Sequence, residues 1–262
     1  MKYFTFGMKV LRVTQSYNQG NHIPHWKDSK DYSDYPIDIA GEDGGRSPYY
    51  ATVDMEVVSI KGHKEGYTDT IWLVATEKCI TPIGEIKPFI MLTHWNPDDP
   101  YIAKLKVGDI VKTGDIICLE GTDGKATGNH FHMVCGDYDK GWANKFIKNS
   151  NGVWVSNGYC YTPEKIMFVN LAFTEVYNAD GINFRYVDII YSKGDSGDNI
   201  VKIDDFLANQ VKGNYYGDYS ESVISTYKRK KGFKNTDGSF IDKETLEKMK
   251  DDGLEIWELL KD

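Results

Sequence analysis

The sequence lacks the long apolar runs, basic blocks and export signals that mark several large classes of protein. No stretch of its 262 residues is apolar for long enough to cross a bilayer, and residues 1–7 lack the apolar core and cleavage site of a secretory signal. The net charge is -8 and there is no long Lys/Arg block, which argues against a general nucleic-acid-binding protein. We therefore expect a protein made in the cytoplasm without a signal peptide, which binds no nucleic acid and has no membrane span.

Cysteines are also few and scattered. Cys79, Cys118, Cys135 and Cys160 form no Cys-x-x-Cys pair. In a chain without an export signal, such thiols are usually buried and reduced. We expect neither a disulfide framework nor a cysteine metal cluster.

The chain does contain enough apolar sequence for one large or two modest domains, with an apolar fraction of 40% and a mean hydropathy of -0.49. Up to about residue 170, short alternating segments are separated by turns, which is typical of β-strands. From about residue 190, apolar residues recur at helical spacing. The fold class we expect is mainly β, a compact antiparallel sheet domain, followed by a small α-helical domain. Two Gly-Asp turns, at Gly108 and Gly114, predict tight hairpins within that sheet.

The segment from residue 126 to residue 134 carries two histidines two residues apart. Because side chains alternate along a strand, His130 and His132 are expected on one face, with Phe131 and Met133 on the other face toward a core. Two imidazoles on one sheet face suit a zinc site in which one binds the metal and the other acts on the substrate. The pair alone leaves open the alternative of two surface histidines on an edge strand.

Other polar residues stand out against their surroundings. Asp38 lies between two isoleucines, so its carboxylate is either hydrogen-bonded, bound to a cation, or solvated on the outer face of a strand. His94 ends an apolar strand over residues 88–95. His22 and His25 lie in a polar segment, residues 18–34, which we interpret as a long surface loop.

These motifs, in this order, resemble the lysostaphin/LytM-type zinc endopeptidases, which cut peptide bonds in bacterial peptidoglycan. Val-Gly-Asp-x-Val-x-x-Gly-Asp at residues 107–115 is followed by Gly-Thr-Asp-Gly-x-Ala-Thr-Gly-Asn-His-Phe-His at residues 121–132, and the likeness covers roughly residues 13–170. The resemblance implies a zinc metallopeptidase domain over residues 1–175, with Zn2+ as cofactor and bacterial peptidoglycan as partner. It assigns Asp38 and His132 as metal ligands and His94 and His130 as catalytic residues, without deciding which of the two histidines is the base.

The first metal ligand departs from the family's common His-x-x-x-Asp pattern, because Asp34 stands four residues before Asp38. Some phage-encoded relatives carry this histidine further upstream, after a Thr-Gln strand, and Gly-Asn-His at residues 20–22 resembles that version. We therefore predict His22 as the third metal ligand, with His25 as the second choice and Asp34 as the third. A phage-encoded lysin of this kind acts on the cell wall after release through a holin, or is carried on a virion.

Residues 190–262 are predicted to form a three-helix domain after a connector at residues 176–189. Over roughly residues 190–251 they resemble the small peptidoglycan-binding domain, through Lys-Gly-Asp-Ser-Gly-Asp-Asn-Ile-Val at residues 193–201 and the segment from Tyr227 to Gly238. Lys228 stands where that family usually has glutamine, and the loop has one extra residue. We expect the basic run at residues 228–231 at a solvated helix C-terminus, where cations suit the dipole. A generic helical cap or dimerisation element is the alternative.

The predicted function is a zinc-dependent endopeptidase that hydrolyses peptide bonds in bacterial peptidoglycan. One alternative is a catalytically inactive wall-binding structural component of a phage particle. Another is a swinging-arm carrier, because residues 107–119 also resemble a lipoyl or biotinyl half-motif, for which only Lys125 is suitably placed. The sequence does not indicate the oligomeric state.

Overall fold

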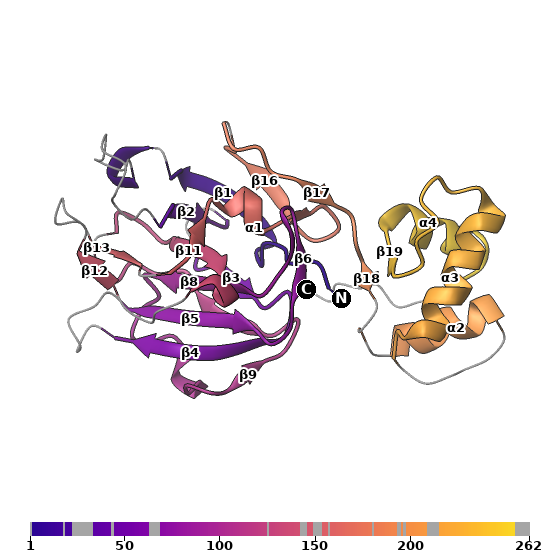
Figure 1. Ribbon diagram of the computed structural model, residues 1–262, viewed down its shortest axis with the longest axis horizontal. Coiled ribbons are helices and arrows are strands. Elements are labelled where there is room, and N and C mark those ends of the chain that lie inside the picture. Colours follow the sequence, from indigo (N-terminus) through magenta and orange to yellow (C-terminus); the bar gives the residue numbers. More distant parts are fainter. Residues whose placement is uncertain are drawn as a thin grey trace. The chain divides into compact units, whose positions relative to one another are not determined.

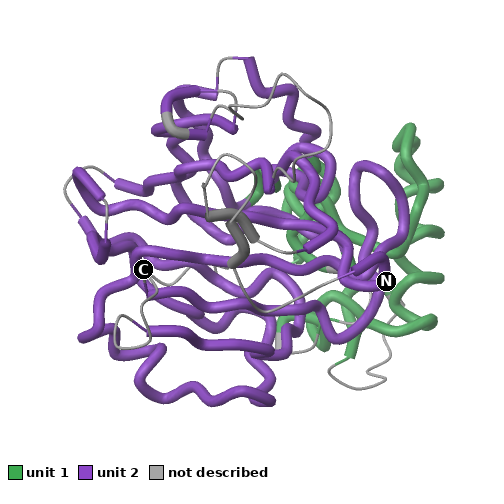
Figure 2. The backbone as a smooth tube through the Cα atoms, turned by 60° about the vertical axis from the view of Figure 1, so that its left-hand side comes forward, with its two compact units in different colours: residues 1–2, 170–172, 187–262 green, residues 3–169, 173–186 purple. Residues whose placement is uncertain are grey.

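The computed structural model describes residues 2–17, 19–22, 34–42, 45–62, 69–124, 126–141, 146–148, 154–156, 158–179, 181–192, 195, 198–208 and 215–254. His25 and Lys125, two of the residues considered above, lie outside these residues. The chain divides into two compact units, coloured separately in Figure 2: unit 2 comprises residues 3–169 and 173–186, and unit 1 comprises residues 1–2, 170–172 and 187–262. The boundaries expected from the sequence, at residues 175 and 190, remain predictions.

Unit 2 is built on a nine-stranded sheet (Figure 1), with strand order β16-β1-β2-β11-β8-β5-β4-β9 and with β14 as a further partner of β11. Its pairs are antiparallel except for β1 with β16. The strands of this sheet are β1 Val10–Gln15, β2 Ile37–Ala40, β4 Met55–Lys61, β5 Thr70–Ala75, β8 Pro88–Thr93, β9 Ile110–Val111, β11 Phe131–Asp137, β14 Cys160–Tyr161 and β16 Glu175–Tyr177.

Short elements complete this part of the chain. The paired strands outside the large sheet are β3 Pro48–Tyr50 with β10 Ile116–Leu119, β6 Cys79–Thr81 with β7 Gly84–Ile86, β12 Phe146–Lys148 with β13 Trp154–Ser156, and β15 Val169–Asn170 with β17 Tyr186–Val187. The described helical segments are α1 Pro163–Ile166 and three 3-10 turns, Gly20–His22, Ile102–Lys104 and Tyr138–Lys140. The prediction of a mainly β, antiparallel fold is confirmed.

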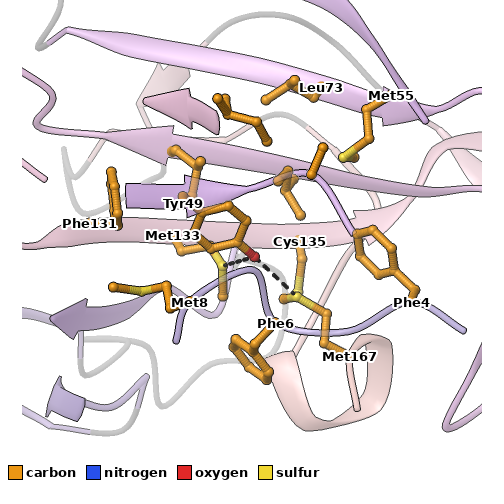
Figure 3. Close-up of a cluster of buried hydrophobic side chains, with 14 of the residues drawn as sticks. Phe4, Phe6, Met8, Tyr49, Met55, Leu73, Phe131, Met133, Cys135 and Met167 are labelled. Carbon is orange, nitrogen blue, oxygen red and sulfur yellow. Dashed lines mark hydrogen bonds between the residues drawn. The ribbon is translucent and has the colours of Figure 1, made fainter. Parts of the chain in front are cut away.

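One face of the large sheet is apolar because its strands alternate with period two. Phe131 and Met133 on β11, and Ile37 and Ile39 on β2, are all fully buried, as the alternation predicted. Figure 3 shows part of this core, where the hydroxyl of Tyr49 on β3 lies 3.7 Å from the sulfur atoms of Met133 and Met167. The buried face fixes the register, since a slip of one residue would expose these side chains.

The opposite face of strands β2, β11, β8 and β5 carries a small apolar cluster of Trp72, Met91 and Val134 and, beside it, polar residues. His132 pairs directly with Asp38 on β2 and with Thr93 on β8, and Thr93 pairs with Thr70 on β5. Directly opposed residues share a face, so these four side chains form a polar row across the sheet. Because β11 lies between β2 and β8 and not at an edge, the edge-strand alternative for the two histidines is wrong.

The two Gly-Asp turns have the same construction. Gly108 and Gly114 have φ of 95° and 91°, a region that glycine enters without steric penalty. In each turn, the following aspartate accepts a backbone N–H three residues back, Asp109 from Lys106 at 2.8 Å and Asp115 from Lys112 at 3.1 Å. The turns are tight but are not hairpins, because β9 pairs with β4 and β10 pairs with β3.

Unit 1 contains the other three described helices, α2 Asp198–Ala208, α3 Asp218–Lys231 and α4 Lys243–Asp251, together with the antiparallel pair β18 Tyr191–Ser192 and β19 Phe240–Ile241. Its separate core consists of Tyr191, Ile200, Ile203, Tyr216, Ile224, Tyr227, Ile241, Leu246, Met249 and Leu254. The helix α3 ends at Gly232 in the left-handed region, and the Asp242 carboxylate caps α4 by accepting the Thr245 N–H at 2.7 Å. The predicted α-helical part is therefore confirmed.

The basic run at the end of α3 differs from the expectation in one residue. Lys228 is fully buried, and its Nζ donates hydrogen bonds of 2.9 Å to the carbonyls of Asp237 and Phe240. The Asp242 carboxylate lies 3.6 Å from Nζ, and the Phe240 ring centroid lies 4.3 Å from it. These groups replace water around the ammonium, so the expectation of a fully solvated run is wrong at Lys228.

The cysteines agree with the expectation of reduced thiols. None of the four forms a disulfide bond, and Cys160 is the one that is not fully buried. Among the residues that the structure describes, no helix combines the length and the apolar character that crossing a bilayer requires.

Candidate metal centre

Three side chains with metal-binding atoms meet at one end of the polar row. Asp38 comes from β2, His132 from β11, and His22 from the 3-10 turn that follows β1. The Asp38 Oδ1 atom lies 3.0 Å from His132 Nδ1 and 3.4 Å from His22 Nε2. One ligand atom from each residue lies within 4.8 Å of the other two, and these residues are the one such group found in the described part of the chain.

The donor set and its spacing fit a zinc ion. Two ligands of a tetrahedral zinc stand about 3.3 Å apart when the zinc–ligand bonds are roughly 2.0–2.1 Å long. The two separations at Asp38 lie close to that value. Two imidazoles and one carboxylate are also ligands of catalytic zinc sites, which keep a fourth position for water or substrate. The residues present therefore suit the metal that the sequence predicted.

Asp38 is the electrostatic centre of this group. Burial by itself would raise the pKa of its carboxyl, but hydrogen bonds with His132 and His22 outweigh burial and hold the pKa well below its usual range. The carboxylate is thus ionised at neutral pH and carries a full negative charge beside three imidazoles, since His130 Nε2 also lies 3.8 Å from Asp38 Oδ2.

The other two histidines of the site are each hydrogen-bonded to a backbone carbonyl through the same nitrogen. His94 Nδ1 is 2.6 Å from the Asp123 carbonyl, and His130 Nδ1 is 2.8 Å from the Gly128 carbonyl. A carbonyl oxygen only accepts, so each Nδ1 carries the proton and, in the neutral ring, each Nε2 is left with a lone pair. The two ring centroids are 4.7 Å apart.

His94 is held in an unusual backbone conformation. Its φ is 79°, in the left-handed region that residues with a Cβ seldom occupy. The backbone there is fixed by hydrogen bonds from His94 N to the Asp69 carbonyl at 3.0 Å and from Asp123 N to the His94 carbonyl at 3.2 Å. Burial lowers the pKa of His94 to about 4, so its ring is neutral near pH 7.

The structure brings together the five side chains that the sequence singled out: His22, Asp38, His94, His130 and His132. Of the other two candidates for the first ligand, Asp34 is outside the group of ligand atoms found in the described residues, and His25 lies outside those residues. The individual roles remain proposals.

Sequence reasoning missed several residues that hold the site. Gly121 pairs with His130, whose N–H donates to the Gly121 carbonyl at 3.2 Å. The Asn129 side chain donates to the Gly45 carbonyl at 2.8 Å, and Glu120 is a buried carboxylate nearby in the sequence. Gly121 and Asn129 belong to the motif from which His130 was recognised, but nothing in their local sequence reveals these partners.

The comparisons with known proteins give partial similarities. No family model and no curated protein matches the chain. Solved structures that it resembles include a zinc-containing peptidase from Vibrio cholerae (22% identity over 51% of this chain, TM-score 0.33) and a mutant catalytic domain of the prophage-encoded protein EnpA from Enterococcus faecalis (19% over 48%, TM-score 0.33). The antimicrobial peptidase lysostaphin from Staphylococcus simulans is a third (19% over 45%, TM-score 0.26). This chain spans 36%, 81% and 52% of those three chains, respectively.

Proposed function

We propose that this chain is a zinc-dependent endopeptidase that hydrolyses peptide bonds in bacterial peptidoglycan. The observation that carries the proposal is the meeting of His22, Asp38 and His132, at distances that suit zinc, beside the rings of His94 and His130. The choice of peptide bonds in peptidoglycan rests on the resemblance of the motifs at residues 107–132 to lysostaphin/LytM-type enzymes.

In this proposal His22, Asp38 and His132 hold the metal. A zinc ion bound by them would act as a Lewis acid on the scissile carbonyl and lower the pKa of its water to about 7. Asp38 contributes the one negative charge of the ligand set, so a divalent cation keeps a net positive charge. The sheet register holds Asp38 and His132 opposite one another before any ion binds, which reduces the ordering that binding requires.

His94 and His130 handle protons. When either ring is neutral, its lone pair is on Nε2, because its Nδ1–H is donated to a backbone carbonyl. Either ring can take the proton of the attacking water, and a ring that has taken it becomes a donor to the oxyanion or the leaving amine. The backbone hydrogen bond on Nδ1 keeps each ring in one orientation through that cycle.

Unit 1 is proposed to serve as a wall-binding module, on the basis of its three helices and the resemblance of residues 190–251 to a small peptidoglycan-binding domain. A weak anchor on a polymeric substrate raises the local concentration of a cleaving unit. Removing residues 190–262 is expected to lower cleavage of intact walls far more than cleavage of soluble muropeptides.

The test is digestion of defined muropeptides with and without a chelator, with the products identified by mass. We expect one tight zinc per chain, cleavage at a peptide bond, and loss of cleavage on chelation. Asp38→Asn removes a ligand charge and should abolish both zinc binding and cleavage. Asp54→Asn is the matched control, because this half-buried carboxylate makes the same charge change while its partners are Lys112 and Thr113.

Two results would contradict the proposal. In the first, the protein binds zinc through Asp38 but cleaves no muropeptide, which means that the site binds metal without having this activity. Protein that binds no zinc at all favours the alternative of an inactive wall-binding component of a phage particle.

A further inference from the structure

Glu120 is a buried acid that the proposed chemistry does not use. The residue directly follows β10 and is 1% exposed. Two backbone N–H groups donate to it, Gly41 to Oε1 at 2.7 Å and Ser47 to Oε2 at 2.9 Å. Each carboxylate oxygen is therefore bonded to one end of the connection between β2 and β3, residues 41–47, which we name the β2–β3 loop.

The backbone of Glu120 fixes the same loop. Its N–H donates to the Ser47 carbonyl at 3.0 Å, and its carbonyl accepts from Arg46 Nε at 2.9 Å. The Arg46 guanidinium in turn faces Asp98 at 3.3 Å and Asp99 at 3.8 Å. Four hydrogen bonds thus join one residue to both ends of the loop, and the two to its side chain require two acceptor oxygens, which a carboxylate has and an amide lacks.

The β2–β3 loop reaches the catalytic side of the sheet. Its Gly45 carbonyl accepts from Asn129 Nδ2 at 2.8 Å, and Asn129 immediately precedes His130. The loop also begins three residues after Asp38, at the end of β2. Loosening of the loop would therefore free the backbone on the N-terminal side of His130.

A second route runs through the residue after Glu120. The Gly121 carbonyl accepts the His130 N–H at 3.2 Å. A Cβ atom added to Gly121 would lie 2.2 Å from the His94 carbonyl oxygen, so its backbone packs directly against that residue. Fixing Glu120 therefore fixes a neighbour that touches both proposed catalytic histidines.

The geometry points to Glu120 as a positioning residue for the reaction, which acts through the β2–β3 loop and Gly121 on His130. This inference rests on the proposed function, and among the described residues the hydrogen bonds of Glu120 go to the β2–β3 loop and not to His22, Asp38 or His132. The ligands Asp38 and His132 are held by the sheet register instead, so zinc affinity should not depend on Glu120. Burial raises the pKa of Glu120 to about 7, so the ionised carboxylate is present at and above neutral pH.

Glu120→Gln is the isosteric test. The amide keeps one acceptor oxygen and turns an NH2 group toward the other backbone N–H, so one end of the loop is released. We expect kcat to fall about tenfold or more, because small misplacements of catalytic groups have effects of that size, while KM and zinc affinity stay unchanged. Glu42→Gln is the matched control, since it makes the same charge change at an exposed position of the same loop and should alter none of the three.

A double-mutant cycle separates positioning from general weakening. Asn129→Ala breaks the hydrogen bond to the Gly45 carbonyl, which lies further along the same route. The fall in kcat of the double variant should therefore be smaller than the product of the falls in the two single variants. Additive free energies, an unchanged kcat in Glu120→Gln, or a parallel loss of zinc affinity would each overturn the inference. If Glu120→Gln does not fold, Asn129→Ala decides alone: reduced kcat at unchanged zinc affinity supports the route and unchanged kcat overturns it.

Imidazole NMR of the metal-free protein gives a readout that needs no activity. Both variants should shift the His130 resonances and leave those of His132 in place, whereas unmoved His130 resonances would overturn the inference. If wild-type protein cleaves no muropeptide, the proposed function fails, and this spectrum still shows whether Glu120 positions His130.

Discussion

The ammonium of Lys228 is expected to hold unit 1 together, and Lys228→Met tests this directly. Methionine keeps most of the chain length and removes the donor, so the carbonyls of Asp237 and Phe240 lose the partner that lies 2.9 Å away, the first in a partly buried contact and the second in a buried one. Each unsatisfied buried acceptor costs about 1–3 kcal/mol. Burial lowers the pKa of Lys228, because holding the charge away from water costs free energy. Removing the charge therefore offsets part of the loss in stability. We therefore expect a net loss of about 2–4 kcal/mol.

Differential scanning calorimetry measures this loss. For a domain of this size, 1 kcal/mol shifts Tm by roughly 4–8 °C, so the transition of unit 1 should fall by roughly 10–30 °C. Chelation identifies the other transition, because the three proposed zinc ligands all belong to unit 2. Arg229→Met is the control, since it removes a neighbouring cation that is exposed. A shift no larger than that of Arg229→Met would refute the reasoning that buried carbonyls depend on Lys228.

Three further predictions concern unit 2. Because the pKa of Glu120 is raised from 4.5 to about 7, wild type should lose about 3 kcal/mol of stability relative to Glu120→Gln as the pH rises from 4.5 through 7, and denaturant titrations across that range check it. Chelation should lower the Tm of wild type and of Asp54→Asn but not that of Asp38→Asn, since about 4 kcal/mol is gained at a thousandfold excess of metal over Kd. Gly121→Ala should destabilise by about 1–3 kcal/mol or more through overpacking against the His94 carbonyl, whereas Gly128→Ala, whose added methyl meets open space, should cost less in the same melting experiment.

The sheet and its polar face were predictable because they follow from a local period. Alternation around Phe131 and Met133 placed His130 and His132 on one face, and an acid between two isoleucines marked Asp38. The pairing of Asp38 with His132 is not local, and only the motif resemblance suggested it. The sheet register then supplies it.

The features that local sequence did not reveal depend on partners far along the chain. Glu120 is paired with residues 73 and 79 positions away, and nothing in its neighbours signals burial. Lys228 follows helical spacing like any solvated lysine, yet its ammonium is bound by the carbonyls of Asp237, in the loop after α3, and of Phe240, in β19. His22 lies in a segment without periodicity, so its assignment rested on resemblance alone. The Gly-Asp turns showed where the chain bends but not which strands it then joins.

The left-handed backbone at His94 sets an unusual rule for mutational scans of this protein. Residues with a Cβ pay about 1–2 kcal/mol to adopt a φ of 79°, and glycine does not. Alanine at position 94 therefore leaves the backbone strain in place and removes the hydrogen bond of the ring. Glycine also removes that hydrogen bond, but it relieves the backbone strain. In a scan scored by cellular abundance, glycine should outrank alanine and every β-branched residue there, the reverse of the usual order at a strand end. A scan scored by wall lysis should tolerate neither glycine nor alanine, because both remove the proposed catalytic ring. Comparing the two scans therefore separates the effect of position 94 on folding from its effect on catalysis.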